Sequence, residues 1–214
     1  MGWGDLFGGR ASEPVANAQD TVVATATRSV PLTGQDRWYV PVDGNRDRFV
    51  DPDGGMPLLH LIRYHSGGEH VLRLCEDATG LLMGPTDRRL APAGIYVSNL
   101  RGESYHKTAC RRGNFSPGTA VQLKREPNNS HDPFAVAITA DADGAAVAAY
   151  VNKAKARTLA KLLDHGTDLA AVSLRGTSSN TACEQVSVLV TRADVMAHLL
   201  SPRPRHLPKP AHQR

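Results

Sequence analysis

Paired cysteines and long apolar runs are both missing from this chain of 214 residues. Its three cysteines, Cys75, Cys110 and Cys183, form no CxxC pair, and their spacing is typical of neither a disulfide framework nor a zinc cluster. No stretch approaches the roughly 18 apolar residues of a membrane-spanning helix, and the first residues, MGWGDLFGGR, hold no apolar run of signal-peptide length. We therefore expect a soluble, cytoplasmic protein in a reducing compartment, with no membrane partner.

Sequence motifs of several common enzyme classes are also absent. The chain has no GxxxxGKS or GxxxxGKT phosphate-binding loop, no GxSxG nucleophile elbow and no HExxH zinc motif. The remaining catalytic candidate is a metal-assisted nuclease built from His106, His131 and Asp132. Because such sites normally gather several carboxylates around Mg²⁺ and only Asp132 is present here, we expect no enzymatic activity and no cofactor.

Glycine and proline are frequent, with 19 and 14 residues, whereas aromatic residues make up only 5% of the chain. So many turn-forming residues favour short elements over a long helical bundle, and the apolar runs between them predict mainly β structure. The formal net charge of +4 permits an anionic partner without requiring one. The length suits one well-buried domain with appendages, or two small domains.

Residues 35–98 alternate short β-like runs with turn clusters. The runs RWYVPV, LLHLIRY and HVLRL are separated by turn-forming stretches such as DGNRD, DPDGG and HSGGE, which predicts a small β-rich segment. Its evenly spaced histidines, His60, His65 and His70, repeat with a period that matches one face of neither a helix nor a strand. We therefore expect no metal site from them.

Residues 99–198 are expected to form the main domain. The runs TAVQLK, FAVAI, AAVAAYV, AAVSL and QVSVLV predict strands. One amphipathic helix is predicted with Asn152 as its N-cap and Gly166 at its C-terminal stop, and a second, short helix at RADVMAHLL. On either side, residues 1–34 are expected to form a flexible arm and residues 199–214 a basic, Pro-rich tail.

Positive charge gathers between Arg101 and His131. This stretch holds six basic and two acidic residues, a net +4 that equals the charge of the whole chain. Tyr105, His106, Phe115 and His131 add flat side chains. Basic groups that follow phosphates and planar groups that stack on bases are the ingredients of a groove for single-stranded nucleic acid, although the same composition also suits a solvated basic loop.

The order of residues from Gly102 to about Gly166 resembles the HIRAN domain family. The most specific part is REPNNSHDPFAV, which begins at Arg125. The other matching positions are Gly102, Tyr105, Gly118, Val121, Leu123, Tyr150, Ala156, Leu159, Ala160 and Gly166. HIRAN domains occur N-terminal to some fork-remodelling helicases and as stand-alone bacterial domains. Many have small, partly open β-barrels related to oligonucleotide-binding (OB) folds, so the expected fold is mainly β, a small OB-like β-barrel with one flanking α-helix, preceded by a short β-rich segment.

The resemblance also implies a site for the 3′ end of single-stranded DNA, serving DNA repair or replication-fork processing. Tyr105 falls on a family aromatic position beside the terminal nucleotide. Asn129 and Asp132 fall on the polar pair of the turn that holds the strand end. Lys153 falls on a basic position that serves the backbone phosphates.

Several positions depart from the pattern of the DNA-end binders, among them Ala149 and Asn152, which replace a usual Gly and a frequent Pro or Lys around the Tyr150 strand end. Ser104 stands where they have an arginine, which removes one phosphate contact, and His131 stands where they have a tyrosine, although a histidine ring can still stack on a base. From the basic stretch, Arg111, Arg112 and Arg125 complete the predicted nucleic-acid-binding residues together with His131.

The same residues also have a purely structural interpretation. Residues 126–129 form a good β-turn sequence, Asp132 before a proline can form an Asx-turn, and a buried Tyr105 or Tyr150 would hold a barrel closed. The alternative function is a protein-interaction module without nucleic-acid binding, which docks a partner through residues 37–100 or through the basic tail.

Overall fold

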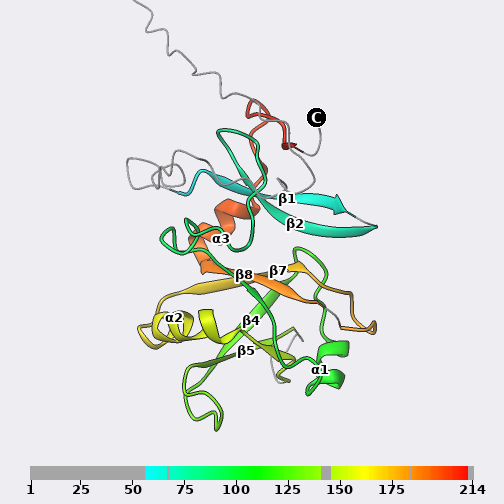
Figure 1. The fold of residues 1–214 in the computed structure, drawn as a ribbon, viewed down its shortest axis with the longest axis vertical. Coiled ribbons are helices and arrows are strands. Elements are labelled where there is room, and N and C mark those ends of the chain that lie inside the picture. Colours follow the sequence, from blue (N-terminus) through cyan, green and yellow to red (C-terminus); the bar gives the residue numbers. More distant parts are fainter. Residues whose placement is uncertain (1–55, 67, 141–145, 184, 212–214) are drawn as a thin grey trace, which may run out of the picture. The chain divides into compact units, whose positions relative to one another are not determined.

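The computed structural model describes residues 56–66, 68–140, 146–183 and 185–211 (Figure 1). The expected arm and the first part of the expected β-rich segment lie outside the described residues. The strands are β1 (Leu59–Ser66), β2 (Glu69–Glu76), β3 (Tyr96–Asn99), β4 (Ala120–Glu126), β5 (Ala135–Thr139), β6 (Ala149–Tyr150), β7 (Leu169–Arg175) and β8 (Ser187–Arg192). The helices are α1 (Lys107–Arg112), α2 (Lys153–Asp164) and α3 (Ala193–Leu200).

Six strands form one antiparallel sheet in the order β3-β8-β7-β4-β5-β6. Its two outer strands meet, because Arg101, just after β3, and Tyr150 in β6 exchange two backbone hydrogen bonds of 2.8 Å. The sheet therefore curls until its outer strands are joined, and at this point neither edge is left unpaired. The predicted fold class, mainly β and consistent with an OB-like barrel, is confirmed.

The strands β7 and β8 separate two apolar cores. Because side chains alternate along a strand, Ala171 and Val190 enter the core inside the curled sheet, where Phe115 and Leu159 are fully buried. Their neighbours on β7 and β8 point the other way. The second core lies on that outer face, and it contains Leu59, Leu72, Leu74, Val172, Leu189 and Leu199.

The outer core is covered by a hairpin and a helix (Figure 1). The strands β1 and β2 pair antiparallel over their full length, and α3 adds Val195 and Leu199 to the same core. The hairpin is the described part of the predicted β-rich segment. It also brings His65 opposite His70, with ring centroids 4.5 Å apart. The regular spacing of the histidines did not predict this contact, because the turn between His65 and His70 reverses the chain.

Two of the three helices were predicted from the sequence. The side chain of Asn152 caps α2 by accepting a hydrogen bond of 2.8 Å from the Ala154 N–H, and Gly166 follows the helix with a φ of +73°. The short helix predicted at RADVMAHLL is α3. In contrast, α1 was not predicted, because six residues with one buried side chain carry no periodic pattern. In the part of the chain that the structure describes, every helix is too short or too polar to span a bilayer.

Candidate nucleic-acid interface

Tyr150 joins two loops that are far apart in the sequence. Its backbone is bonded to Arg101, which leads into residues 102–106. Its hydroxyl donates a hydrogen bond of 3.1 Å to Glu126 Oε2, at the start of the turn formed by residues 126–132. Burial and the neighbouring Glu126 carboxylate both raise the pKa of this tyrosine, so it stays a neutral hydrogen-bond donor. The residues that the sequence assigned to binding the end of a DNA strand therefore lie on both sides of the contact between Arg101 and Tyr150, which we call the seam of the barrel.

The turn of residues 126–132 is shaped by its own polar side chains. Asn129 donates from Nδ2 to Glu126 Oε2 at 3.0 Å and accepts at Oδ1 from the backbone N–H groups of His131 and Asp132, at 3.0 and 3.2 Å. Asp132 Oδ1 accepts a hydrogen bond of 2.8 Å from the Phe134 N–H. The proposed Asx-turn is thus present. It occupies one carboxylate oxygen of Asp132, and among the described residues the structure gives Oδ2 no hydrogen-bond partner, so that oxygen is available to a ligand.

Tyr105 is held away from the protein body. Its side chain is 90% exposed, while its backbone N–H donates to the Gly102 carbonyl at 2.9 Å. Gly102 has a φ of +86°, which favours glycine and turns the chain sharply after the seam. The interpretation of Tyr105 as a buried barrel residue is therefore wrong. It suits Tyr150, which is half-buried and lies 5.6 Å from the His106 ring, centroid to centroid.

The other expected stacking groups divide into two kinds. His131 is exposed on the turn, where its ring can reach a ligand. Phe115, by contrast, is fully buried inside the curled sheet, and the expectation that it offers a stacking surface is wrong. A lone phenylalanine among basic residues gives no sign in the sequence of which way it points.

The predicted basic residues also occupy different environments. Arg125 donates to both oxygens of Asp164, at 3.0 and 3.2 Å, and to the Ala135 carbonyl at 3.3 Å, so its charge is largely compensated. Arg111 and Arg112 are exposed in the last turn of α1, and Lys153 is exposed at the first position of α2. Among the described residues these three have no ion pair, which leaves their charges available to phosphates.

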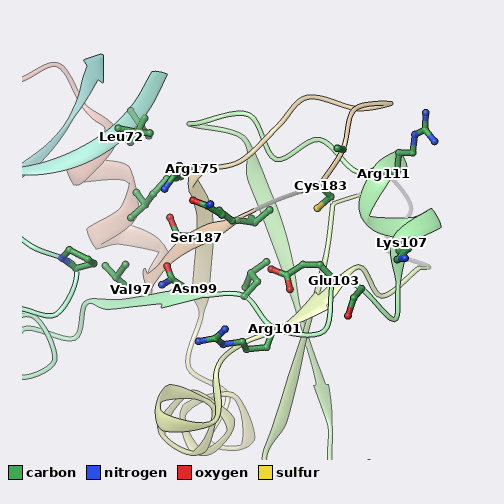
Figure 2. A pocket seen from close by; sticks show the side chains of 18 of the residues that line it. Leu72, Val97, Asn99, Arg101, Glu103, Lys107, Arg111, Arg175, Cys183 and Ser187 are labelled. Carbon is green, nitrogen blue, oxygen red and sulfur yellow. The ribbon is translucent and has the colours of Figure 1, made fainter. Parts of the chain in front are cut away.

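A pocket of about 1040 Å³ opens beside the loop of residues 102–106 (Figure 2). Glu103 and Ser104 of that loop line it, as do Lys107 and Arg111 of α1. Its remaining lining comes from β2 and the loop after it, from β3 and the residues that follow it, and from β7, β8 and the loop between them: Val71, Leu72, Arg73, Pro85, Val97, Asn99, Leu100, Arg101, Leu174, Arg175, Ala182, Cys183, Gln185, Val186 and Ser187. Sequence reasoning missed this pocket, because its walls come from segments that no local pattern connects.

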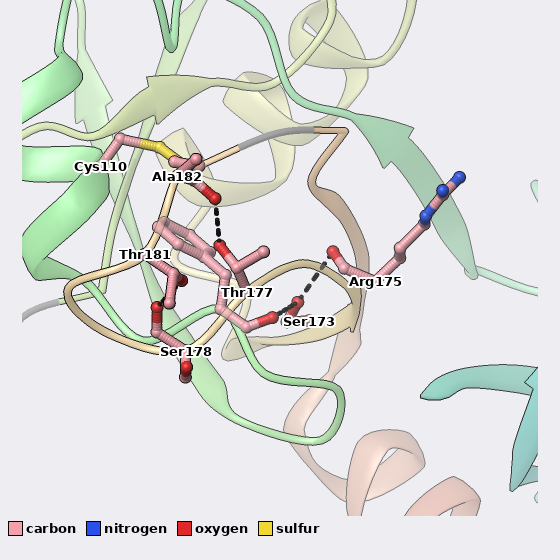
Figure 3. Close-up of a disulfide and its surroundings, with 9 residues drawn as sticks. Cys110, Ser173, Arg175, Thr177, Ser178, Thr181 and Ala182 are labelled. Atoms are coloured by element: carbon pink, nitrogen blue, oxygen red, sulfur yellow. Dashed lines mark hydrogen bonds between the residues drawn. A yellow bond between two sulfur atoms is a disulfide. The ribbon is translucent and has the colours of Figure 1, made fainter. Parts of the chain in front are cut away.

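A disulfide borders the pocket and corrects the expectation of unpaired cysteines. Cys110 of α1 is bonded to Cys183 in the loop between β7 and β8 (Figure 3), with a Cα–Cα distance of 5.8 Å across a separation of 73 residues. Spacing along the chain cannot show that two cysteines meet in space. The expectation of a reducing compartment rested on unpaired cysteines and loses that support. Cys75 stays a free thiol, and burial raises its pKa to about 11.

One group of side chains among the described residues could hold a metal ion, and it lies outside this interface. It consists of His60, Asp77 and His198. Asp77 already accepts from His60 Nδ1 at 2.9 Å and from Arg203 Nε at 3.2 Å, while His198 Nε2 lies 2.8 Å from the Pro57 carbonyl oxygen. The guanidinium beside Asp77 opposes a second cation, so we interpret this group as an ion-pair network that fastens the basic tail. The three nuclease candidates form no comparable group among the described residues.

Comparison with known proteins identifies the domain that carries this interface. A search of curated proteins gives no match. Similar solved structures include the HIRAN domain of human HLTF, with 19% identity, 50% of this chain and 83% of that chain covered and a TM-score of 0.36. A protein from Lactobacillus plantarum is similar with 20% identity, 45% and 92% coverage and a TM-score of 0.35. The family model of the HIRAN domain matches residues 94–191, and this part of the chain is a HIRAN domain.

Proposed function

We propose that the HIRAN domain of this chain binds single-stranded DNA, prefers its 3′ end and acts in DNA repair or replication-fork processing. The observation that carries the proposal is the exposed ring of Tyr105, whose loop joins the turn of residues 126–132 at the Tyr150 seam. An aromatic ring displayed to solvent beside hydrogen-bonding groups is the arrangement on which an unpaired base stacks. The family resemblance supports the same site.

Each residue has a distinct role in this mechanism. The Tyr105 ring stacks on a base near the strand end, and His131 offers a second flat surface. Asp132 Oδ2 accepts a hydrogen bond from the free 3′-hydroxyl, which an internal phosphate cannot donate. Lys153 and Arg111 neutralise phosphates of the same strand. No step of covalent chemistry is involved, so the proposed role is binding without catalysis.

The rival function, a protein-interaction module, has less to support it. The described part of residues 37–100 turns the apolar face of its hairpin into the protein's own core. The basic tail is held by polar contacts instead, since Arg203 donates to the Asp77 carboxylate and to the Asp77 backbone carbonyl. Neither segment is therefore presented mainly for a partner protein.

The proposal is tested by the chemistry of the strand end. A labelled strand that ends in a 3′-hydroxyl should bind about tenfold to a hundredfold more tightly than the same strand with a 3′-phosphate, because a hydrogen bond to a carboxylate contributes roughly 1.5–3 kcal/mol. Fluorescence anisotropy titrations measure both affinities. Equal affinities would reduce the domain to a general single-strand binder, and absence of binding would favour the protein-interaction module.

Asp132→Asn is the matched control variant for this experiment. The amide keeps the oxygen that accepts from the Phe134 N–H, so the turn should stay intact. Removing the negative charge reduces repulsion of a 3′-phosphate and should narrow the difference between the two strand ends. A difference that is unchanged in this variant would show that Asp132 does not read the end.

A further inference from the structure

The pocket beside residues 102–106 is strongly positive. Five of its described lining residues are basic and one, Glu103, is acidic, which gives a net charge of +4. The charges are spread across its width: Figure 2 shows Arg175 beside Leu72 on one side and Lys107 and Arg111 on the other. A pocket with separated positive charges fits a ligand that carries several negative charges along its length.

Two of these cations lie on the side of the pocket where the β1–β2 hairpin meets β7. Arg73 of β2 and Arg175 of β7 both line the pocket. Burial lowers the pKa of the Arg73 guanidinium; Tyr64 opposes this by raising the pKa, and the nearby positive charge of Arg175 lowers it further. Arg175 already pairs with Glu69, so a phosphate that binds beside the two arginines would replace this carboxylate as the partner of Arg175. Of the two, Arg73 lies outside the matched HIRAN range, since β2 precedes residue 94, whereas Arg175 lies within it.

Base stacking has no part in this pocket, whose lining combines charged, hydrogen-bonding and apolar side chains. Of the described residues that line it, none is aromatic, so bases have no ring on which to stack. Its polar lining side chains include Asn99, Ser104, Gln185 and Ser187, which can bond to phosphate or sugar oxygens. The complementary ligand is therefore a sugar-phosphate backbone more than a base.

The pocket adjoins the loop that carries Tyr105. Glu103 and Ser104 line the pocket, and Tyr105, the next residue, displays its ring to solvent. If the 3′-terminal base stacks on Tyr105, the phosphates on its 5′ side can enter the pocket beside Lys107 and Arg101, which line it. The two sites can hold one molecule.

We propose that this pocket is a second section of the nucleic-acid path, which binds the backbone phosphates of a single strand several nucleotides from its captured 3′ end, with Arg175 and Arg73 as the farthest contacts. The inference rests on the proposed function. It adds a length requirement that the end site alone does not impose, and it gives the hairpin outside the matched domain a part in binding.

A salt bridge provides the test. Arg175 Nη2 lies 2.8 Å from Glu69 Oε2, and both side chains are partly exposed. Arg175→Gln and Glu69→Gln break the same bridge, but the first removes a cation from the pocket and the second removes an anion that competes with phosphate. A structural role of the bridge would change both variants in the same direction, whereas a phosphate-binding role changes them in opposite directions.

The probes are two 3′-hydroxyl strands, one of about four nucleotides and one of about twelve, and both lengths lie within the range of about 4–16 nucleotides that OB folds bind. In the unmodified protein the longer strand should bind more tightly. Arg175→Gln should weaken only the longer strand and lower its log-log salt slope by about 0.7, the value for one phosphate contact on single strands. Glu69→Gln should strengthen the longer strand. Lys161→Gln, which removes an exposed charge on α2 away from the pocket, should change neither.

The outcomes separate the two proposals. If the short strand binds with 3′-end preference but added length brings no gain, or if the gain survives Arg175→Gln, the pocket inference is overturned and the end site stands. Weaker long-strand binding by both bridge variants also overturns it. If neither strand binds, the proposed function fails, and this inference fails with it.

Discussion

The exposed ring of Tyr105 allows a stacking role to be separated from a structural one. Tyr105→Ala should weaken binding of a short single strand by about 1–3 kcal/mol, the range for one base stacked on an aromatic ring. Tyr105→Phe should have little effect, because stacking uses the face of the ring and the hydroxyl adds no surface. Anisotropy titrations of the three proteins measure the difference.

Thermal melts supply the control. Because the side chain is 90% exposed, neither substitution should lower the melting temperature appreciably. A large loss of stability in Tyr105→Ala would show that the ring supports the loop, and unchanged binding in a stable Tyr105→Ala protein would remove it from the interface.

At the scale of single residues, the sequence predicted which charged and aromatic residues belong to the candidate interface better than it predicted their burial and their partners. Composition placed Arg111 and Arg125 in one basic stretch, yet the first is exposed and the second is bonded to Asp164. The partner of Arg125 lies 39 positions away, at the end of α2, where no local pattern points to it. The Asx-turn at Asp132 was predictable, because its hydrogen bond spans only two residues.

At the scale of elements, α1 and the loop between β7 and β8 depend on the disulfide between Cys110 and Cys183. Reduction should lower the free energy of unfolding by about 2–4 kcal/mol, since the bond closes a long loop in the unfolded chain. Urea unfolding with and without reductant measures this change. Cys183→Ser should be about as stable as the reduced parent, whether or not reductant is present. A parent protein whose stability does not change with reductant would contradict the pairing.

The elements themselves were predictable in proportion to their length and regularity. The helix α2 carries a cap, an apolar stripe and a glycine stop within one short window, and the strands have turn clusters between them. The pairing of the two cysteines had no such signal. Nor did the seam, because Arg101 and Tyr150 meet only after the whole sheet has curled.

At the scale of the whole described structure, the two cores share β7 and β8, so the hairpin and the curled sheet should unfold together. Leu59→Ala, at a fully buried position of the hairpin, should cost about 2–5 kcal/mol. Circular dichroism in the far ultraviolet and in the near ultraviolet should show the same single unfolding transition in urea. Two separate transitions would mean that the hairpin is an independent unit.

The seam between Arg101 and Tyr150 makes ligand binding and closure of the sheet thermodynamically linked. Both loops that face the proposed strand end contact this seam: residues 102–106 follow Arg101, and the turn of residues 126–132 accepts the hydrogen bond of the Tyr150 hydroxyl at Glu126. A ligand that bridges the loops therefore favours the closed seam, and it stabilises the closed sheet in proportion to the logarithm of its concentration over its dissociation constant. Conversely, local opening of the seam releases the ligand. The dissociation rate of a bound strand therefore cannot be lower than the rate at which the hydrogen bonds between Arg101 and Tyr150 open.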